Sequence, residues 1–203
     1  MRHIKSAALL LLACTVVLTG CTAVTPTPQT PGGEGETVRK VVVATDATWP
    51  PFEFVDEATK EIIGFDIDLM KAIAKAAGFE VEFQNVPFDP LLAGMATGQY
   101  DAAISAITIT EDRKENMLFS EPYFNAGQLI VVQATNDAIQ SPADLAGKLV
   151  GAQIATTGAR AVEELGANLK TYDDVGSAYL DLANGQVEAV VADSPLAIGD
   201  VLK

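Results

Sequence analysis

The sequence predicts an α/β fold built around a mainly parallel sheet. Between residues 38 and 107, three strand-like runs alternate with two segments of helical apolar spacing. The last run, 102–107, is apolar and passes directly into hydroxyl, acidic and arginine side chains (DAAISAITITEDR, 101–113). Because ligands bind at the carboxyl edge of open α/β sheets, this transition indicates a binding site there.

The elements of this first part follow from apolar spacing and breakers. We expect strands at 38–45, 79–86 and 102–107. Two helices should lie between them. The first starts with Asp66 as its N-cap and stops at Gly78; the second starts at Asp89-Pro90 and stops at Gly98.

The rest of the chain continues the same alternation. Strands are expected at 127–134, 148–154 and 186–192. Helices should start at Ser141-Pro142, at 155–158, at Asp174 and at Ser194-Pro195, where caps and prolines suit a first turn.

The N-terminus reads as a targeting segment. Arg2, His3 and Lys5 precede a short apolar run, and Leu18-Thr19-Gly20-Cys21 resembles a bacterial lipobox. We expect residues 1–20 to be a lipoprotein signal peptide and Cys21 to be lipidated, against the alternative of a plain secretory signal. Residues 21–37, rich in Thr, Pro and Gly, should form a disordered tether.

Charge and composition exclude several classes of function. Loss of Arg2 and Lys5 would move the net charge from −14 to −16, a surface that repels nucleic acid. Cleavage would also remove His3 and Cys14. We therefore expect no catalytic triad, no catalytic residues, no metal site and no cofactor.

Three charged residues stand where predicted strands end. Arg113 could hold a carboxylate through two parallel hydrogen bonds, or be a solvated surface residue. Asp46, with Trp49 close behind it, suits a cationic or zwitterionic group, but could be a turn residue beside a core tryptophan. Asp193 repeats the pattern of Asp46, with an N-cap role as the alternative.

These motifs, in this order, resemble the polar amino-acid-binding proteins of bacterial ABC importers, solute-binding protein family 3. The matching stretches are Asp46 with Trp49-Pro-Pro-Phe-Glu, Gly64-Phe-Asp-Ile-Asp-Leu, Phe88, Ser105 to Arg113, and Phe119-Ser-Glu-Pro-Tyr123. The resemblance implies a two-lobe, type II periplasmic-binding-protein-like fold. Residues 38–128 would be lobe 1 and residues 129–203 a hinge strand with a partial lobe 2. The family's return strand and second hinge crossing would be missing.

The resemblance also implies a role for each ligand-binding residue. Arg113 and Thr108 would hold the ligand's α-carboxylate, helped from the second lobe by Thr156 and Thr157. Ser105 and Asp193 would meet the α-amino group. Trp49 and Phe88 would sandwich the ligand side chain, Asp46 would meet its polar end, and Ala106 and Gln153 complete the set. Phe88 and Thr157 could instead be a hydrophobic staple and a helix cap.

The expected function is that of an extracytoplasmic, lipid-anchored binding protein. It would bind one free amino acid, with arginine, lysine or glutamine favoured, and deliver it to an ABC permease in the cytoplasmic membrane. We expect a monomer. The alternatives are a periplasmic enzyme on the same fold, similar to cyclohexadienyl dehydratase, with Glu53 as the added acid, or a ligand-sensing module.

Overall fold

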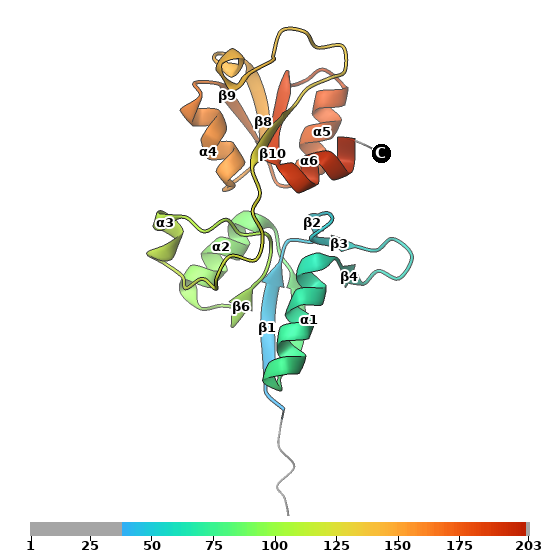
Figure 1. The fold of residues 1–203 in the computed structure, drawn as a ribbon, viewed down its shortest axis with the longest axis vertical. Coiled ribbons are helices and arrows are strands. Elements are labelled where there is room, and N and C mark those ends of the chain that lie inside the picture. The colour runs from blue at the N-terminus through green and yellow to red at the C-terminus, as the bar shows by residue number, and fades with distance from the viewer. Residues whose placement is uncertain (1–37, 202–203) are drawn as a thin grey trace, which may run out of the picture. The chain divides into compact units, whose positions relative to one another are not determined.

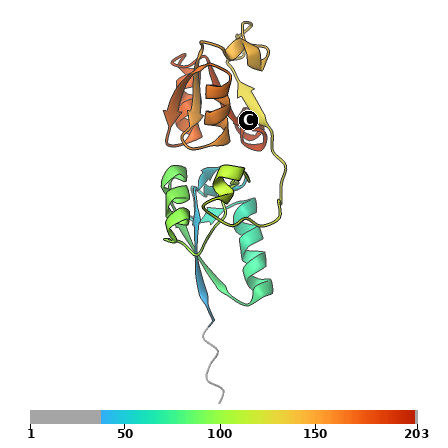
Figure 2. The same cartoon turned by 90° about the vertical axis from the view of Figure 1, so that its left-hand side faces the viewer.

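The computed structural model describes residues 38–201 (Figures 1 and 2). The predicted signal peptide, the lipidated Cys21 and the tether lie outside these residues. The described chain contains two mixed or parallel sheets, each flanked by helices, and one small antiparallel sheet. We call the elements from β1 to α3 the first lobe and those from β7 to α6 the second lobe.

The first lobe is built on a parallel sheet with strand order β5-β1-β6. Its strands are β1 (Lys40–Thr45), β5 (Glu80–Asn85) and β6 (Ala102–Ala103). The helices are α1 (Phe65–Ala77), α2 (Phe88–Thr97) and the short α3 (Glu111–Lys114). Antiparallel strands β2 (Thr48–Trp49), β3 (Glu53–Val55) and β4 (Ile62–Ile63) form the small sheet.

The second lobe is built on a four-stranded sheet with order β7-β10-β8-β9, parallel except for β7. Its strands are β7 (Gln128–Val131), β8 (Leu149–Gln153), β9 (Asn168–Tyr172) and β10 (Ala189–Asp193). Its helices are the 3-10 turn η1 (Pro142–Leu145), α4 (Thr157–Glu164), α5 (Val175–Ala183) and α6 (Ser194–Val201). The α/β prediction is therefore confirmed. Strand β9 was not predicted, because it lies at the edge of the sheet and its sequence, NLKTY, is largely polar.

The predicted strand at 102–107 is wrong beyond Ala103. Ile104 still donates to the carbonyl of Ala44, but Ala106 has a φ of 45°, in the left-handed region. The Ala106 N–H donates to the carboxylate of Asp66 instead of to strand β1. The apolar run thus leaves the sheet early and turns its backbone towards α1.

The predicted N-cap of the first long helix is also wrong. Gly64 occupies that position with a φ of 131° and ψ of 178°, a conformation essentially reserved for glycine. A Cβ there would lie 2.2 Å from the carbonyl oxygen of Phe52. Asp66 lies inside the first turn, fully buried. The helix ends as predicted, with Gly78 in the left-handed conformation.

The other helix starts agree more closely with the prediction. Helix α2 begins at Phe88, just ahead of the predicted Asp89-Pro90 start, and Asp174 caps α5 through the N–H of Ser177. The segment after Ser141 closes a capping box with Asp144 but is a single 3-10 turn. Cap residues thus located the starts well, while the type and length of helix depended on packing.

One apolar cluster contains side chains from both lobes. Trp49 and Phe52 of the first lobe pack with residues of α5, β10 and α6, including Val175, Leu182 and Leu196. Phe52 is itself the centre of an aromatic group, edge-on to Phe65 at 5.9 Å and to Phe124 at 5.1 Å between ring centroids. Trp49 ends β2 and Phe52 lies in the turn before β3, so these contacts attach the small sheet to the second lobe and to the aromatic group.

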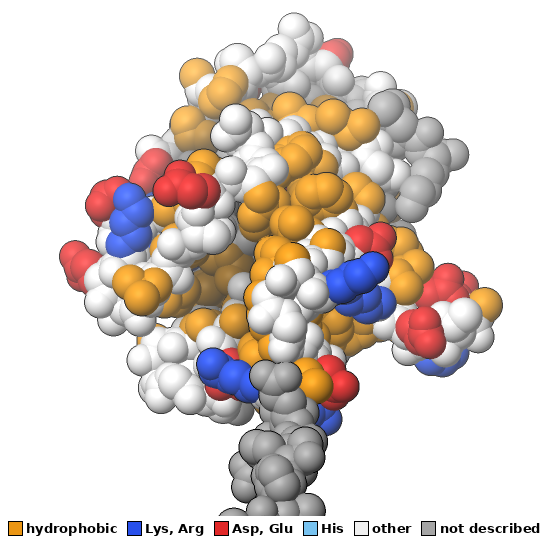
Figure 3. Space-filling model, turned by 60° about the horizontal axis from the view of Figure 1, so that its bottom comes forward, with side chains coloured by type: hydrophobic (Ala, Val, Ile, Leu, Met, Phe, Trp, Pro, Cys, Tyr) orange, Lys and Arg blue, Asp and Glu red, His pale blue; other side chains and the backbone are white. Residues whose placement is uncertain are grey.

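Part of the apolar content remains at the surface. Phe65, Tyr123 and Phe124 are all partly exposed, and Figure 3 shows apolar side chains gathered along one face with charged groups around them. The Phe65 and Tyr123 rings lie tilted against each other at 33°, with their centroids 6.1 Å apart. This contact holds the segment after α3 against the start of α1. Within residues 38–201, no helix has the length and apolar character needed to cross a membrane.

Candidate ligand-binding site

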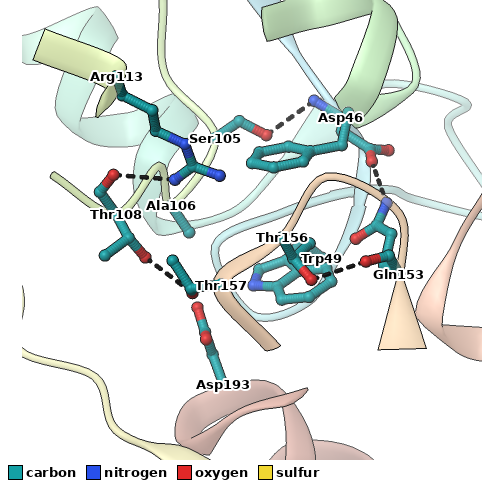
Figure 4. Close-up of a pocket in the computed structure, with 11 residues that line it drawn as sticks. Asp46, Trp49, Ser105, Ala106, Thr108, Arg113, Gln153, Thr156, Thr157 and Asp193 are labelled. Carbon is teal, nitrogen blue, oxygen red and sulfur yellow. Dashed lines mark hydrogen bonds between the residues drawn. The ribbon is translucent and has the colours of Figure 1, made fainter. Parts of the chain in front are cut away.

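A pocket of about 320 Å³, open solvent at its mouth included, lies among residues of both lobes. The structure brings together all the residues expected to bind the ligand: Asp46, Trp49, Phe88, Ser105, Ala106, Thr108, Arg113, Gln153, Thr156, Thr157 and Asp193 (Figure 4). Its lining of aromatic rings, hydroxyls, an amide and three charged side chains suits a small polar organic ligand.

The ends of secondary-structure elements place these side chains. Asp46 follows the last residue of β1, and Gln153 and Asp193 end β8 and β10. Because these strands are parallel, their carboxyl ends face the same edge of each sheet. Phe88 begins α2, buried against the pocket rather than merely preceding the helix.

Arg113 is fixed at one side of the pocket by two backbone carbonyls. Its guanidinium donates to the Thr108 oxygen at 2.9 Å and to the Ala155 oxygen at 2.8 Å. It also lies 5.4 Å from the centroid of the Phe88 ring. Burial lowers the pKa of Arg113, and the nearby charge of Asp112 opposes that effect. A guanidinium has five N–H donors, so donors remain for a ligand.

Asp193 brings the opposite charge from the second lobe. Its carboxylate is buried and accepts a hydrogen bond from the side-chain amide of Gln128. Burial raises the pKa of Asp193, while the Gln128 hydrogen bond and the charge of Arg113 oppose the rise. In Figure 4 the Arg113 guanidinium and the Asp193 carboxylate both point into the space between the drawn residues.

Asp46 and Gln153 form a second polar region of the pocket. Gln153 Nε2 donates to Asp46 Oδ2 at 2.7 Å and to the Asp173 carbonyl at 2.8 Å. The Thr48 hydroxyl donates to Asp46 Oδ1 at 2.8 Å, a bond between two side chains and not the bond to its own backbone considered for a turn residue. Burial raises the pKa of Asp46, and the Thr48 and Gln153 hydrogen bonds oppose it.

Two buried polar atoms of pocket residues lack a hydrogen-bond partner among the described residues. They are Gln153 Oε1 and Trp49 Nε1. The amide nitrogen of Gln153 donates to both nearby acceptors, the Asp46 carboxylate and the Asp173 carbonyl, and this fixes the orientation of the amide. The amide oxygen is left without a donor among the described residues. Since buried polar groups are normally hydrogen-bonded, Gln153 Oε1 is an acceptor available to a hydrogen-bond donor of a ligand.

Helix α4 presents its N-terminus to the same pocket. Thr156 is its cap: its hydroxyl accepts from the Ala159 N–H at 3.1 Å and donates to the Gln153 carbonyl. The cap role considered for Thr157 is therefore wrong. The Thr157 hydroxyl instead lies 3.5 Å from that of Thr108 and accepts from Gln128. Free N–H groups at such a helix start favour an anion.

Several contributors around the pocket were missed from sequence. Gln128 faces Asp193 only because β7 pairs antiparallel with β10, a register that no local pattern encodes. Asp66 and Glu53, which the sequence suggested only as a helix cap and as the acid of an enzyme, accept hydrogen bonds from Ala106 and Ser105 behind the pocket. Glu53 does not line the pocket. Among residues 38–201, no group of three or more His, Cys, Asp or Glu side chains could hold a metal ion.

Comparisons with known proteins show the family of this chain. Residues 41–196 match the family model for bacterial extracellular solute-binding proteins, family 3. ABC transporter arginine-binding protein 1 of Escherichia coli is 36% identical over 157 residues, which are 76% of this chain and 63% of that protein. The arginine-binding extracellular protein ArtP of Bacillus subtilis is 31% identical over 94% of this chain and 73% of its own length.

Solved structures give the same result. An ancestral arginine-binding protein bound to arginine is 44% identical, with a TM-score of 0.76 over 80% of this chain and 74% of that one. The arginine-, lysine-, histidine-binding protein ArtJ of Geobacillus stearothermophilus is 42% identical, with a TM-score of 0.77 over 81% and 71%. The chain spans just under two thirds of the Escherichia coli relative. On the extent of the family match and these identities, the chain belongs to the bacterial extracellular solute-binding proteins, family 3.

Proposed function

We propose that this protein binds one free amino acid with a cationic side chain, arginine or lysine, and that glutamine is the next best ligand. It would serve as the extracytoplasmic binding component of an ABC importer and hand the ligand to a permease. The observation that carries the proposal is the presence of Arg113 and Asp193, from different lobes, in one pocket. Opposite fixed charges match the carboxylate and ammonium groups of a zwitterion.

The α-carboxylate would lie against Arg113, with Thr108 and the start of α4 as further donors. The α-ammonium would lie against Asp193 and the carbonyl of Ser105. A ligand held in this way contacts both lobes. Binding would therefore favour the arrangement in which the lobes face one another, because only that arrangement offers both sets of contacts.

Charge and hydrogen bonding favour a cationic side chain. Asp46 and Asp193 against Arg113 leave one uncompensated negative charge in the pocket. A zwitterion adds no net charge, whereas arginine or lysine adds one positive charge and balances it. Asp46 and the free Oε1 of Gln153 are acceptors for a donor-rich side chain, and the Trp49 and Phe88 rings can flank its aliphatic part.

A thermal-shift screen of the twenty amino acids tests the proposal. A ligand present at about 1,000 times its dissociation constant stabilises the folded state by about 4 kcal/mol. We expect the largest rise in melting temperature with arginine or lysine, a smaller rise with glutamine, and none with glutamate. Titration calorimetry with the best ligand should give a stoichiometry of one. A screen in which no amino acid shifts the transition contradicts the proposal.

The lipid anchor is a separate part of the proposal and has a separate test. Cys21 follows Leu18-Thr19-Gly20, and lipidation there would tether the protein to the outer face of a membrane. In a bacterial host, the wild-type protein should fractionate with membranes and a Cys21→Ala variant should not. Equal membrane association of both would rule out anchoring through this cysteine.

A further inference from the structure

Two fully buried carboxyl groups lie behind the pocket, Glu53 on β3 and Asp66 in the first turn of α1. Neither makes an ion pair with a lysine or arginine in the described part of the chain. Burying one unpaired carboxylate is costly, and burying two side by side is more so. Hydrogen bonds or a bound proton must therefore offset the cost of burying these two acids.

Each carboxyl group holds one residue of the pocket lining. Glu53 Oε1 accepts a 2.9 Å hydrogen bond from the hydroxyl of Ser105, and that hydroxyl accepts from the N–H of Asp46. Asp66 Oδ2 accepts from the N–H of Ala106 and from the hydroxyl of Tyr123, both at 2.8 Å. The Ser105–Ala106 corner is thus fixed from behind by both acids.

The other oxygen of each acid is also buried. Glu53 Oε2 and Asp66 Oδ1 have no hydrogen-bond donor among residues 38–201. The two acids come from neighbouring backbone, because the N–H of Asp66 donates at 2.9 Å to the carbonyl of Phe52, the residue before Glu53, and the adjacent residues Ser105 and Ala106 each donate to one of them. Two ionised carboxylates can only accept and repel, whereas a single proton makes one of them a donor to the other.

We propose that Glu53 and Asp66 share one proton, with Glu53 the neutral donor and Asp66 the carboxylate, and that this acid pair positions the Ser105–Ala106 corner for the ligand. The assignment follows from the donors that face each group. Asp66 receives two hydrogen bonds, from Ala106 and Tyr123, which favour its ionised form. Glu53 receives one, from Ser105.

The titratable groups around the pair favour a neutral Glu53 and an ionised Asp66: Asp46 raises the pKa of Glu53, and the hydrogen bond from Tyr123 lowers the pKa of Asp66. Burial raises the pKa of Glu53 well above its ordinary value, and the charge of Asp66 and, more weakly, of Asp46 raises it further. Burial also raises the pKa of Asp66, against the hydrogen bonds from Ala106 and Tyr123. Burial and the charge of Asp66 raise the pKa of Tyr123, so its phenol remains a donor.

The shared proton gives the corner a pH dependence of defined sign. A group whose pKa is raised by folding stabilises the fold fully below its unfolded pKa, and that stabilisation is lost as pH rises through the folded pKa. Ionisation of Glu53 would set a second negative charge beside Asp66. Repulsion between the two carboxylates would then displace the acceptors that hold Ser105 and Ala106, the latter at a φ of 45°. The consequence for ligand binding rests on the proposed function; the shared proton does not.

Infrared difference spectroscopy of the ligand-free full chain tests the proton directly. The wild-type protein at neutral pH should show the C=O stretch of a protonated carboxylic acid, and the Glu53→Gln variant should lack it. Glu57→Gln, which changes an exposed carboxylate four residues away, is the matched control and should keep the band. If Glu53→Gln leaves the spectrum unchanged, the shared proton is excluded.

The pH dependence of the melting temperature is the second measurement. Glutamine can donate to Asp66 and accept from Ser105 in place of the neutral acid, so Glu53→Gln should fold and lose the alkaline fall in stability. Glu53→Ala, which removes both bonds, should melt lower at every pH. A Glu53→Gln profile parallel to wild type would overturn the proposal.

Ligand affinity is measured last, with L-arginine as the probe. Glu53→Gln should change the dissociation constant by less than about threefold at neutral pH, and Glu53→Ala by more than about tenfold. If L-arginine does not bind the wild type, the proposed function fails while the spectroscopic and pH results still decide on the proton. A Glu53→Ala variant that binds as wild type refutes the positioning role.

Discussion

The guanidinium of Arg113 donates a 2.8 Å hydrogen bond to the carbonyl oxygen of Ala155, and so connects α3 of the first lobe with the loop before α4 in the second. Ala155 has a φ of 61°, which orients its peptide in a way that an ordinary strand end would not. The residue proposed to bind the ligand carboxylate is therefore also a contact between the lobes, and its replacement should affect both.

Replacing Arg113 by alanine should weaken ligand binding by about 10- to 150-fold, since a hydrogen bond to a charged group contributes roughly 1.5–3 kcal/mol. Arg113→Lys should restore little of the loss, because an ammonium lacks the planar fork that serves the Thr108 and Ala155 carbonyls and a carboxylate together. Titration calorimetry measures both. Lys114→Ala, a change at an exposed neighbour, is the control. Equal affinity of Arg113→Ala and wild type would remove Arg113 from the site.

The two pocket aspartates should differ in what they recognise. Asp193→Asn should weaken arginine, lysine and glutamine alike, because all carry the same α-ammonium group. Asp46→Asn should weaken arginine and lysine at least about tenfold more than glutamine, because it removes the charge that the side chain meets. Calorimetry with the three ligands gives the ratios. Equal losses for arginine and glutamine in Asp46→Asn would show that Asp46 does not read the side chain.

The location of the site could be predicted because it depends on strand ends. Asp46, Gln153 and Asp193 each end or follow a buried strand, and parallel strands gather such residues at one edge. Periodicity and end signals are local, so a single sequence contains them. The resemblance to a known family then supplied the role expected of each residue, which periodicity does not give.

What could not be predicted depends on non-local geometry. The strand at 102–107 stopped early because Ala106 is held in a left-handed conformation by Asp66, which lies 40 residues earlier. The sequence predicts Asp66 as a cap because its position near a helix start is typical of one. Its burial and its hydrogen bond from Tyr123 depend on tertiary packing, and so does the pairing of Gln128 with Asp193.

An exposed ion pair between the lobes should stabilise the protein in a salt-sensitive way. Arg160 donates to both carboxylate oxygens of Asp112, at 2.7 and 3.2 Å. In a double-mutant cycle, Asp112→Asn and Arg160→Gln should each lower the melting temperature slightly. The double variant should lie no lower than either, and high salt should remove the differences. Additive losses that persist in salt would show that the two side chains act independently.

The same pair predicts a pH dependence. The hydrogen bonds from Arg160 hold the pKa of Asp112 below its usual range. Stabilisation from a depressed carboxyl pKa is present above the unfolded pKa and is lost as pH falls through the folded pKa. The gap in melting temperature between wild type and Arg160→Gln should therefore be constant near neutrality and close in acid. A gap that widens in acid would contradict the assignment.

Gly64→Ala should be the most destabilising single-methyl change in the first lobe. The backbone conformation of Gly64 costs a non-glycine residue about 1–3 kcal/mol, and a Cβ 2.2 Å from the Phe52 carbonyl oxygen forces the chain apart in addition. We expect a loss of more than about 3 kcal/mol in denaturant unfolding. The matched control is Gly127→Ala, where an added Cβ meets nothing within 4 Å.

Because Phe52, Gly64 and the start of α1 together hold Asp66 in place, Gly64→Ala should also weaken ligand binding while Gly127→Ala does not. Similar unfolding free energies for the two variants would show that the close approach of β3 and α1 is not needed.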